Sequence, residues 1–243
     1  MTRYKLTLEY DGTELIGWQE NRQGPSVQSI IRDAIEKFCG TRPDVVGAGR
    51  TDAGVHAVAM VAHTDIPGEH TANTVMRALN FYLVGQPVAV LNCEIVSDEF
   101  HARFDCTARH YKYIVLNRAA SPVLDKNRVY WVPRALDIEA MRVAAQKLIG
   151  NHDFTSFRAS ECQAKSPVKT LDKITITKNG NEIVFEFSAR SFLHHMVRNI
   201  VGTLIEIGLG KPYDIGSVLD ARDRSAAGPT APASGLYFIR ADY

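Results

Sequence analysis

The chain has few cysteines, and none of them forms a pair. Its 243 residues include four, which lie far apart without a Cys-x-x-Cys spacing: Cys39, Cys93, Cys106 and Cys162. A cysteine zinc site or the disulfide framework of a small secreted domain would need closer or paired spacing. We therefore expect reduced thiols in a cytoplasmic protein.

Long apolar runs and a strong excess of one charge are absent too. No segment approaches the roughly 20 apolar residues that cross a bilayer, and no basic, apolar leader opens the chain, so we expect no membrane association. The 28 Lys and Arg residues nearly balance the 27 Asp and Glu residues, which leaves a net charge of +1. Such a chain is not a polycation that binds any phosphate backbone. If it binds nucleic acid, its cations must gather in a cleft.

Phosphate loops and nucleotide-binding fingerprints are also missing. The most distinctive stretch that is present is Gly49–Ala57, GRTDAGVHA. Its glycines let a ligand or another backbone come close, and the small apolar run that follows indicates a buried strand. Asp52 is thus expected in a loop at the mouth of a core strand. A carboxylate there can act as nucleophile or base, or it can simply cap a turn and pair with Arg50 on the surface.

A second informative stretch combines aromatic and basic residues. Phe100–Phe104 is followed by Ala108–Tyr113, ARHYKY. In an extended strand Tyr111 and Tyr113 lie on one face, whereas the charged residues lie on the other. The pattern fits either a stacking surface or an aromatic core strand with a solvated basic side.

A third stretch, Phe192–Ile207, carries apolar residues at helical spacing, and Ser191 is the expected N-cap. Arg198 falls at the edge of the apolar stripe, with His194 one turn before it and Gly202 one turn after it. A half-buried arginine needs a partner, and a carboxylate is the best one. Gly202 leaves a gap through which another element can approach.

The histidines suggest two other sites. The pair His194-His195 resembles a metal site, but adjacent residues of a helix point in different directions, so we expect no metal there. Asp52 could form a hydrolase site with His56 or His63. Histidines on a buried strand, however, are more often core residues with satisfied hydrogen bonds.

Periodicity and turn signals place further elements along the chain. The predicted helices cover 26–38, with Ser26 as N-cap and Gly40 as stop, 71–83, and 137–150, capped by Asp137. The predicted strands cover 4–10, 55–63, 88–96, 171–177 and 183–189, with a hairpin at Asn179-Gly180 and a final strand after the proline-rich segment 228–235. These elements form two similar halves, 1–104 and 105–243, and indicate an α+β fold.

The stretch Gly49–Ala57 resembles the signature of the TruA family of tRNA pseudouridine synthases. Tyr10–Gln19 resembles that family's opening motif, although Leu15 stands where an aromatic residue is usual. Further blocks begin at Phe100, His152, His194 and Gly228, in the family's order. The resemblance implies two ferredoxin-like (RRM-like) subdomains that share a mostly antiparallel mixed sheet, with helices on one side and a central cleft. It also implies isomerisation of uridine to pseudouridine at positions 38, 39 and 40 of the tRNA anticodon arm, by a homodimer without cofactor or metal.

The resemblance makes Asp52 the essential aspartate and Tyr111 the residue that stacks on the target base. We expect Arg198 to keep Asp52 ionised and aimed. Arg50 is placed to fill the space of a flipped-out base, and Leu236 to exclude water. The further candidates for binding RNA are Arg158, in a basic loop with Lys165 and Lys169, and His194.

The main alternative is a non-catalytic RNA-binding module on the same fold, in which Asp52 is an idle turn residue. A carboxylate that points into an RNA groove would weaken binding unless it takes part in chemistry. This consideration favours the enzyme.

Overall fold

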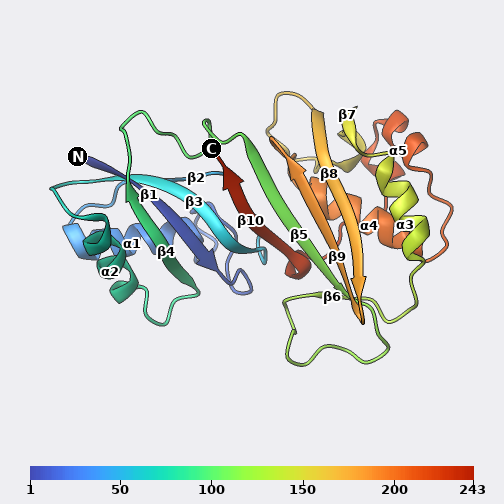
Figure 1. Ribbon diagram of the computed structural model, residues 1–243, viewed down its shortest axis with the longest axis horizontal. Helices are drawn as coiled ribbons and strands as arrows, with labels where there is room; N and C mark the ends of the chain where they lie inside the picture. Colours follow the sequence, from blue (N-terminus) through green and yellow to red (C-terminus); the bar gives the residue numbers. More distant parts are fainter. The chain divides into compact units, whose positions relative to one another are not determined.

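The computed structural model describes all 243 residues, which form two compact units (Figure 1). Unit 1 comprises Met1–Thr107 and Tyr237–Tyr243, and unit 2 comprises Ala108–Leu236. The first crossing lies close to the expected division after residue 104. The last residues differ from the expectation, because their strand returns to unit 1 and places Tyr237 opposite His56. That residues 1–104 and 105–243 are the two subdomains of the protein stays a prediction.

Unit 1 is a mixed, mostly antiparallel sheet with two helices. Its elements are β1 (Thr2–Tyr10), α1 (Val27–Cys39), β2 (Val45–Gly47), β3 (His56–Ile66), α2 (Ala72–Tyr82), β4 (Val88–Ile95) and β10 (Leu236–Asp242). The strand order is β4-β1-β3, and β2 and β10 pair with different parts of β3. The order of β4, β1, β3 and β2, connected as βαββαβ, is the predicted ferredoxin-like arrangement. All pairs are antiparallel except β3–β10.

The helices of unit 1 begin and end at the residues that the sequence indicates. Ser26 and Ser29 form a reciprocal capping box at the start of α1, and Gly40 ends the helix in the left-handed conformation at φ 73°. Thr71 caps α2 through the backbone N–H of Thr74. The apolar residues of β1 alternate toward a buried face, and both helices contact β4. The predicted helices and strands of this half are confirmed.

Unit 2 holds an antiparallel sheet in the order β5-β9-β8-β7, with β6 parallel to β5. Its elements are β5 (Ala108–Leu116), β6 (Tyr130–Trp131), α3 (Ile138–Gln146), β7 (Gly150–Asp153), β8 (Val168–Asn179), β9 (Glu182–Ala189), α4 (Met196–Gly208) and α5 (Ile215–Ala221), with short 3-10 turns at 155–157, 224–226 and 233–235. The β8–β9 hairpin turns at Gly180, as predicted. Residues of β5 alternate between buried and half-buried, and Tyr111 and Tyr113 share the buried face.

Two helix predictions in unit 2 are wrong at one end. α3 stops at Gln146, and β7 begins at Gly150, so Ile149 is exposed rather than turned inward. α4 begins at Met196, four residues later than expected. His195 precedes it in the left-handed conformation at φ 62°, which interrupts a helix, and Ser191 is therefore not its cap.

No helix of the protein has the length and apolar character of a membrane span.

Candidate active site

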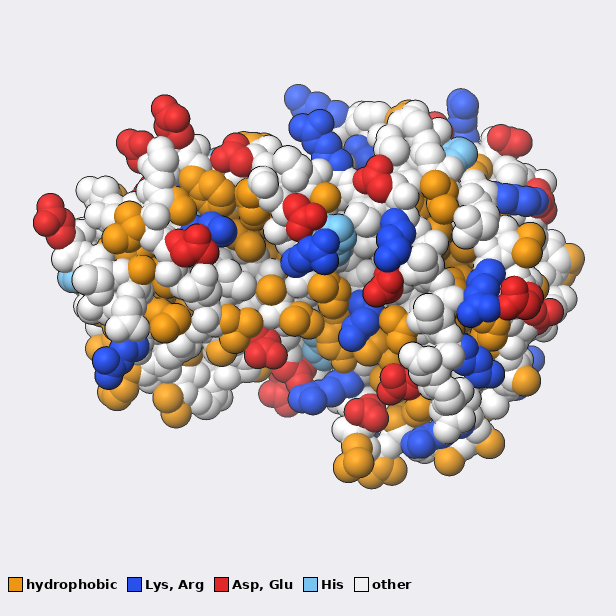
Figure 2. All heavy atoms as spheres, in the orientation of Figure 1, with side chains coloured by type: hydrophobic (Ala, Val, Ile, Leu, Met, Phe, Trp, Pro, Cys, Tyr) orange, Lys and Arg blue, Asp and Glu red, His pale blue; other side chains and the backbone are white.

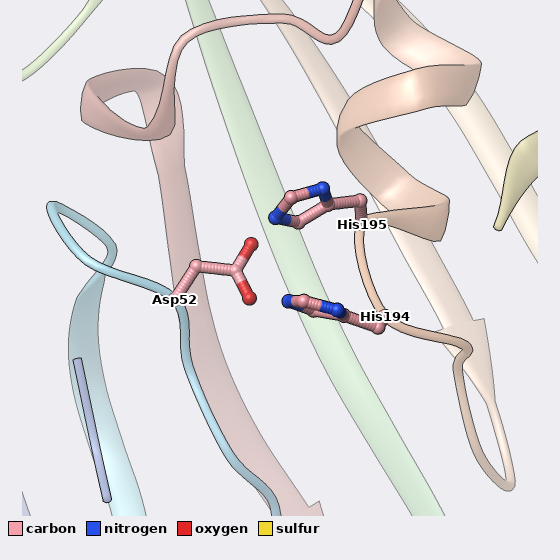
Figure 3. A group of neighbouring side chains, drawn as sticks. All are labelled: Asp52, His194 and His195. Carbon is pink, nitrogen blue, oxygen red and sulfur yellow. The ribbon is translucent and has the colours of Figure 1, made fainter. Parts of the chain in front are cut away.

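Asp52 lies in the loop that leads into β3, as the sequence predicts. The residue is half-buried, and Figure 3 shows its carboxylate projecting from the loop. Backbone groups of the segment after β1 hold this loop: Asp52 forms an antiparallel bridge with Gly17, and the Trp18 N–H donates to the Thr51 carbonyl at 3.0 Å. The Gly54 N–H donates to the Leu15 carbonyl at 3.3 Å. The loop is thus paired to a second strand-like segment rather than standing free.

Glycines make this close pairing possible. Gly17 adopts φ 106°, and a Cβ there would lie 2.5 Å from the Thr51 carbonyl oxygen. A Cβ on Gly12 would lie 2.1 Å from the Val55 carbonyl oxygen. The Tyr10 and Thr51 hydroxyls add a hydrogen bond of 2.9 Å. The opening motif therefore braces the Asp52 loop, a role that the sequence alone did not reveal although its glycines were visible.

The histidines of β3 are core residues. The Nδ1 of His56 accepts the Gly12 N–H at 3.1 Å, and its ring stacks on Tyr237. The Nδ1 of His63 accepts the Ala102 N–H at 3.1 Å, and burial lowers the pKa of His63 to about 4. Both rings are buried. Their burial and hydrogen bonds agree with the expectation of satisfied core histidines.

Tyr111 and Tyr113 occupy the buried face of β5 in different ways. The Tyr111 ring packs edge-to-face against Phe192, with ring centroids 5.0 Å apart. The Tyr113 hydroxyl donates to the Pro232 carbonyl at 2.7 Å, and burial raises the pKa of this phenol. Tyr113 is thus an anchor for the proline-rich segment. Tyr111 remains the candidate for stacking.

Arg198 lies half-buried on the first turns of α4. Its Nε donates to the Ala231 carbonyl at 2.8 Å, and the Ala231 N–H donates back to the Arg198 carbonyl at 3.1 Å. The approach expected at Gly202 is confirmed, because a Cβ there would lie 1.7 Å from the Pro229 carbonyl oxygen. The proline-rich segment thus packs directly on α4. A carboxylate partner for Arg198 stays a prediction.

His194 and His195 lie in the turn before α4, not on the helix. Their ring centroids are 4.1 Å apart, and Figure 3 shows both imidazoles projecting from the turn in the same direction. The divergence of neighbouring helical residues therefore does not apply to these two histidines. The His194 carbonyl accepts the Ala159 N–H at 3.0 Å, which ties this turn to the loop that carries Arg158. The expectation of no metal stays a prediction.

The remaining candidates have different surroundings. Arg50 is exposed on the Asp52 loop of unit 1. Leu236 is buried at the start of β10, directly after the segment that Arg198 and Tyr113 anchor. Arg158 is half-buried after the 155–157 turn, in the same loop as Lys165. The expectation that Lys169 belongs to this loop is wrong, because Lys169 lies on β8, paired with His152. Unit 2 thus joins the Arg158 loop, the His194 turn, Arg198 and the segment before Leu236 through hydrogen bonds.

Comparison with known proteins identifies the chain. A family model described as tRNA pseudouridine synthase matches residues 7–105 and 144–243. The chain belongs to this family. Curated proteins named tRNA pseudouridine synthase A are similar over essentially the whole length: that of Paramagnetospirillum magneticum is 54% identical over 100% of this chain and 96% of its own, and that of Rhodospirillum centenum is 56% identical over 100% of both. That of Rhodospirillum rubrum is 52% identical over 99% of this chain and 87% of its own.

Among solved structures, a chain titled as part of a Cbf5-Nop10-Gar1 complex aligns with 97% of this chain and 48% of its own at 11% identity and a TM-score of 0.40. That likeness is too distant to bear on the fold or the activity. The tRNA pseudouridine synthase family and its TruA members, in contrast, make this protein an isomerase that acts on tRNA. The non-catalytic RNA-binding module considered from the sequence is thereby set aside.

Proposed function

We propose that this tRNA pseudouridine synthase acts on uridines 38, 39 and 40 of the anticodon arm, with Asp52 as the group that attacks the nucleotide. The observation that carries this proposal is the brace around Asp52: a half-buried carboxylate in a loop fixed by the Gly17 bridge and by the bonds to Thr51 and Gly54. A turn residue without a role in chemistry would not need such support. A reacting carboxylate must be held within a narrow range of positions.

The reaction moves one bond without net oxidation or hydrolysis. The N-glycosidic bond of uridine breaks, the uracil turns, and its C5 bonds to the sugar while the C5 proton leaves and a proton returns to nitrogen. Asp52 can attack the anomeric carbon, add to the pyrimidine ring, or remove a sugar proton to give a glycal. Each route requires the ionised carboxylate. A base in a stem must first leave the stack, and Arg50, exposed on the same loop, is suited to take its space.

The other candidate residues have supporting roles in the proposal. Tyr111 stacks on the flipped uracil, and its fixed packing against Phe192 limits the directions in which its ring can move. Arg198 keeps Asp52 ionised and oriented, since a guanidinium matches the fork of a carboxylate. Leu236 excludes water, which would otherwise trap the detached intermediate and hydrolyse it.

We also propose that RNA contacts extend along unit 2. Arg158 and His194 bind the RNA backbone next to the reacting nucleotide, which is supported by the hydrogen bond that links their two segments. As the TruA resemblance implies, the active form is a homodimer that uses neither a cofactor nor a metal. We place it in the cytoplasm, as expected from its unpaired cysteines.

The Asp52→Asn variant tests the proposal. It keeps the shape of the side chain but removes its charge, so we expect no pseudouridine in an anticodon-arm RNA after incubation and nucleoside analysis. The affinity for the same RNA should stay nearly unchanged. The matched control is Asp44→Asn, which removes an exposed carboxylate of unit 1 and should react like the wild type. Turnover of Asp52→Asn near the wild-type rate would exclude Asp52 from the chemistry.

A further inference from the structure

One buried amide joins three segments that lie far apart in the chain. Asn199, on the first turn of α4, is completely buried. Its Nδ2 donates to the Phe157 carbonyl at 2.8 Å. Its Oδ1 accepts hydrogen bonds from the Thr230 hydroxyl at 2.6 Å and from an Arg224 terminal nitrogen at 3.1 Å. The amide therefore connects the loop of Arg158, the start of α4 and the proline-rich segment.

Arg224 completes this network from the short turn at 224–226. One terminal nitrogen donates to the Gly228 carbonyl at 2.9 Å, and the other donates to the Thr230 hydroxyl at 3.0 Å as well as to Asn199. These acceptors are neutral, and burial lowers the pKa of this guanidinium. Burying a cation against neutral oxygens costs desolvation free energy that an apolar anchor would avoid. What the arginine contributes that an apolar residue would not is orientation, because its planar guanidinium holds several acceptors at set angles.

The segment held by this network is the one that holds Arg198. Thr230 is bound by Asn199 and Arg224, and the next residue, Ala231, accepts the Arg198 Nε and donates to the Arg198 backbone. A shift of Thr230 would therefore move the carbonyl that sets the direction of the Arg198 guanidinium.

We propose that Arg224, Asn199 and Thr230 are positioning residues for pseudouridine formation: they fix the Ala231 carbonyl, which in turn orients Arg198. This inference rests on the proposed role of Arg198 beside Asp52. In this proposal, the three residues do not contact the Asp52 carboxylate or the target base. They act only by orienting Arg198, which does.

The Thr230→Val and Thr230→Ser pair provides the first test, with kcat and KM for tRNA measured separately. Valine keeps the shape but removes the hydroxyl, so kcat should fall about tenfold or more while KM stays nearly constant. Serine restores the hydroxyl and should restore kcat. The matched control is Ser234→Ala, which removes a hydroxyl of the neighbouring turn that donates to the Val129 carbonyl, and its kcat should stay at the wild-type level. Equal kcat values for Val, Ser and wild type would overturn the inference.

Arg224→Lys provides a second variant if the valine protein does not fold. It keeps the charge, but a single ammonium group cannot hold Gly228, Thr230 and Asn199 together, so the same loss of kcat is expected. A wild-type kcat for Arg224→Lys would contradict the proposal.

The double variant Arg198→Lys/Thr230→Val separates the inference from the proposed function. If Thr230 acts through Arg198, the double variant should be no slower than Arg198→Lys alone. Losses that multiply would show that Thr230 acts independently and would overturn the inference. If Arg198→Lys lowers kcat but Thr230→Val keeps the wild-type kcat, the proposed role of Arg198 stands and only the role of the network is excluded. If Arg198→Lys keeps the wild-type kcat, both the role of Arg198 and that of the network are excluded.

Discussion

The imidazole of His63 is stabilised in its neutral form by the fold. Burial, followed by the nearby Arg3 guanidinium, lowers the pKa of His63 to about 4, whereas an unfolded histidine titrates at about 6.5. Between these values the unfolded chain binds a proton that the folded chain does not bind. The free energy of unfolding therefore decreases as the pH falls through this window. The contribution is complete above about pH 6.5 and is lost toward about pH 4.

This linkage gives a prediction for His63→Asn. The amide oxygen can still accept the Ala102 N–H but does not titrate, so the variant should lose less stability on acidification. The difference in pKa corresponds to about 3 kcal/mol of unfolding free energy for the wild type between pH 7 and pH 4. Urea titrations of both proteins at pH 7, 5.5 and 4.5 measure it. Parallel pH dependence of the two proteins would show that His63 does not contribute.

Single residues differ in how far their sequence reveals their role. The position of Asp52 could be predicted because its signals are local: glycines around it and an apolar strand after it. The role of Asn199 could not, because its amide binds groups from residues 157, 224 and 230, which no local pattern relates. The catalytic assignments of Asp52, Tyr111 and Arg198 remain predictions from resemblance and chemistry.

At the scale of elements, the two glycines of α4 differ sharply in their surroundings. A Cβ at Gly202 would lie 1.7 Å from the Pro229 carbonyl oxygen, so Gly202→Ala must displace the proline-rich segment. A Cβ at Gly208 would lie 2.8 Å from the sulfur of Met141, a flexible side chain that can move. We expect Gly202→Ala to lose about 3 kcal/mol or more of unfolding free energy. Gly208→Ala, the matched control, should lose much less, since alanine favours helix by about 1 kcal/mol.

Denaturant titration and pseudouridine formation check this pair together. If the segment can be displaced without unfolding the protein, Gly202→Ala should fold yet turn over slowly, because Arg198 loses its fixed acceptor at Ala231. Wild-type stability and wild-type turnover in Gly202→Ala would contradict the packing described for α4.

Element boundaries follow the same distinction between local and distant causes. The limits of α1 could be predicted because Ser26 and Gly40 stop the helix by their own chemistry. The start of α4 could not be predicted, because Phe192 and Leu193 continue the apolar spacing of the helix although they lie before the turn that precedes it. Tertiary contacts such as the Phe192–Tyr111 pair, rather than helical hydrogen bonds, account for their apolar character.

At the scale of the whole molecule, the chain must bind a polyanion with a net charge of only +1. On the face in Figure 2, acidic and basic side chains are interspersed rather than separated. The overall electrostatic attraction between the protein and the RNA backbone is therefore weak, and affinity for tRNA must come from particular cations.

The α+β class and the order of helices and strands could be predicted from the sequence. The return of the last strand to unit 1 could not, because it depends on pairing between Tyr237 and His56, residues some 180 positions apart.

Salt dependence tests which cations bind the RNA. Each cation that contacts a phosphate releases counterions, so its removal should reduce the slope of log affinity against log salt by about 1. We expect this result for Arg158→Gln and for Lys169→Gln in tRNA binding measured at several salt concentrations. Lys147→Gln is the control, because Lys147 is paired with Asp214 at 2.6 Å and should leave the slope unchanged. If all three variants reduce the slope equally, only net charge matters, and neither Arg158 nor Lys169 makes a specific contact. If only the first two do, Arg158 and Lys169 contact the tRNA backbone.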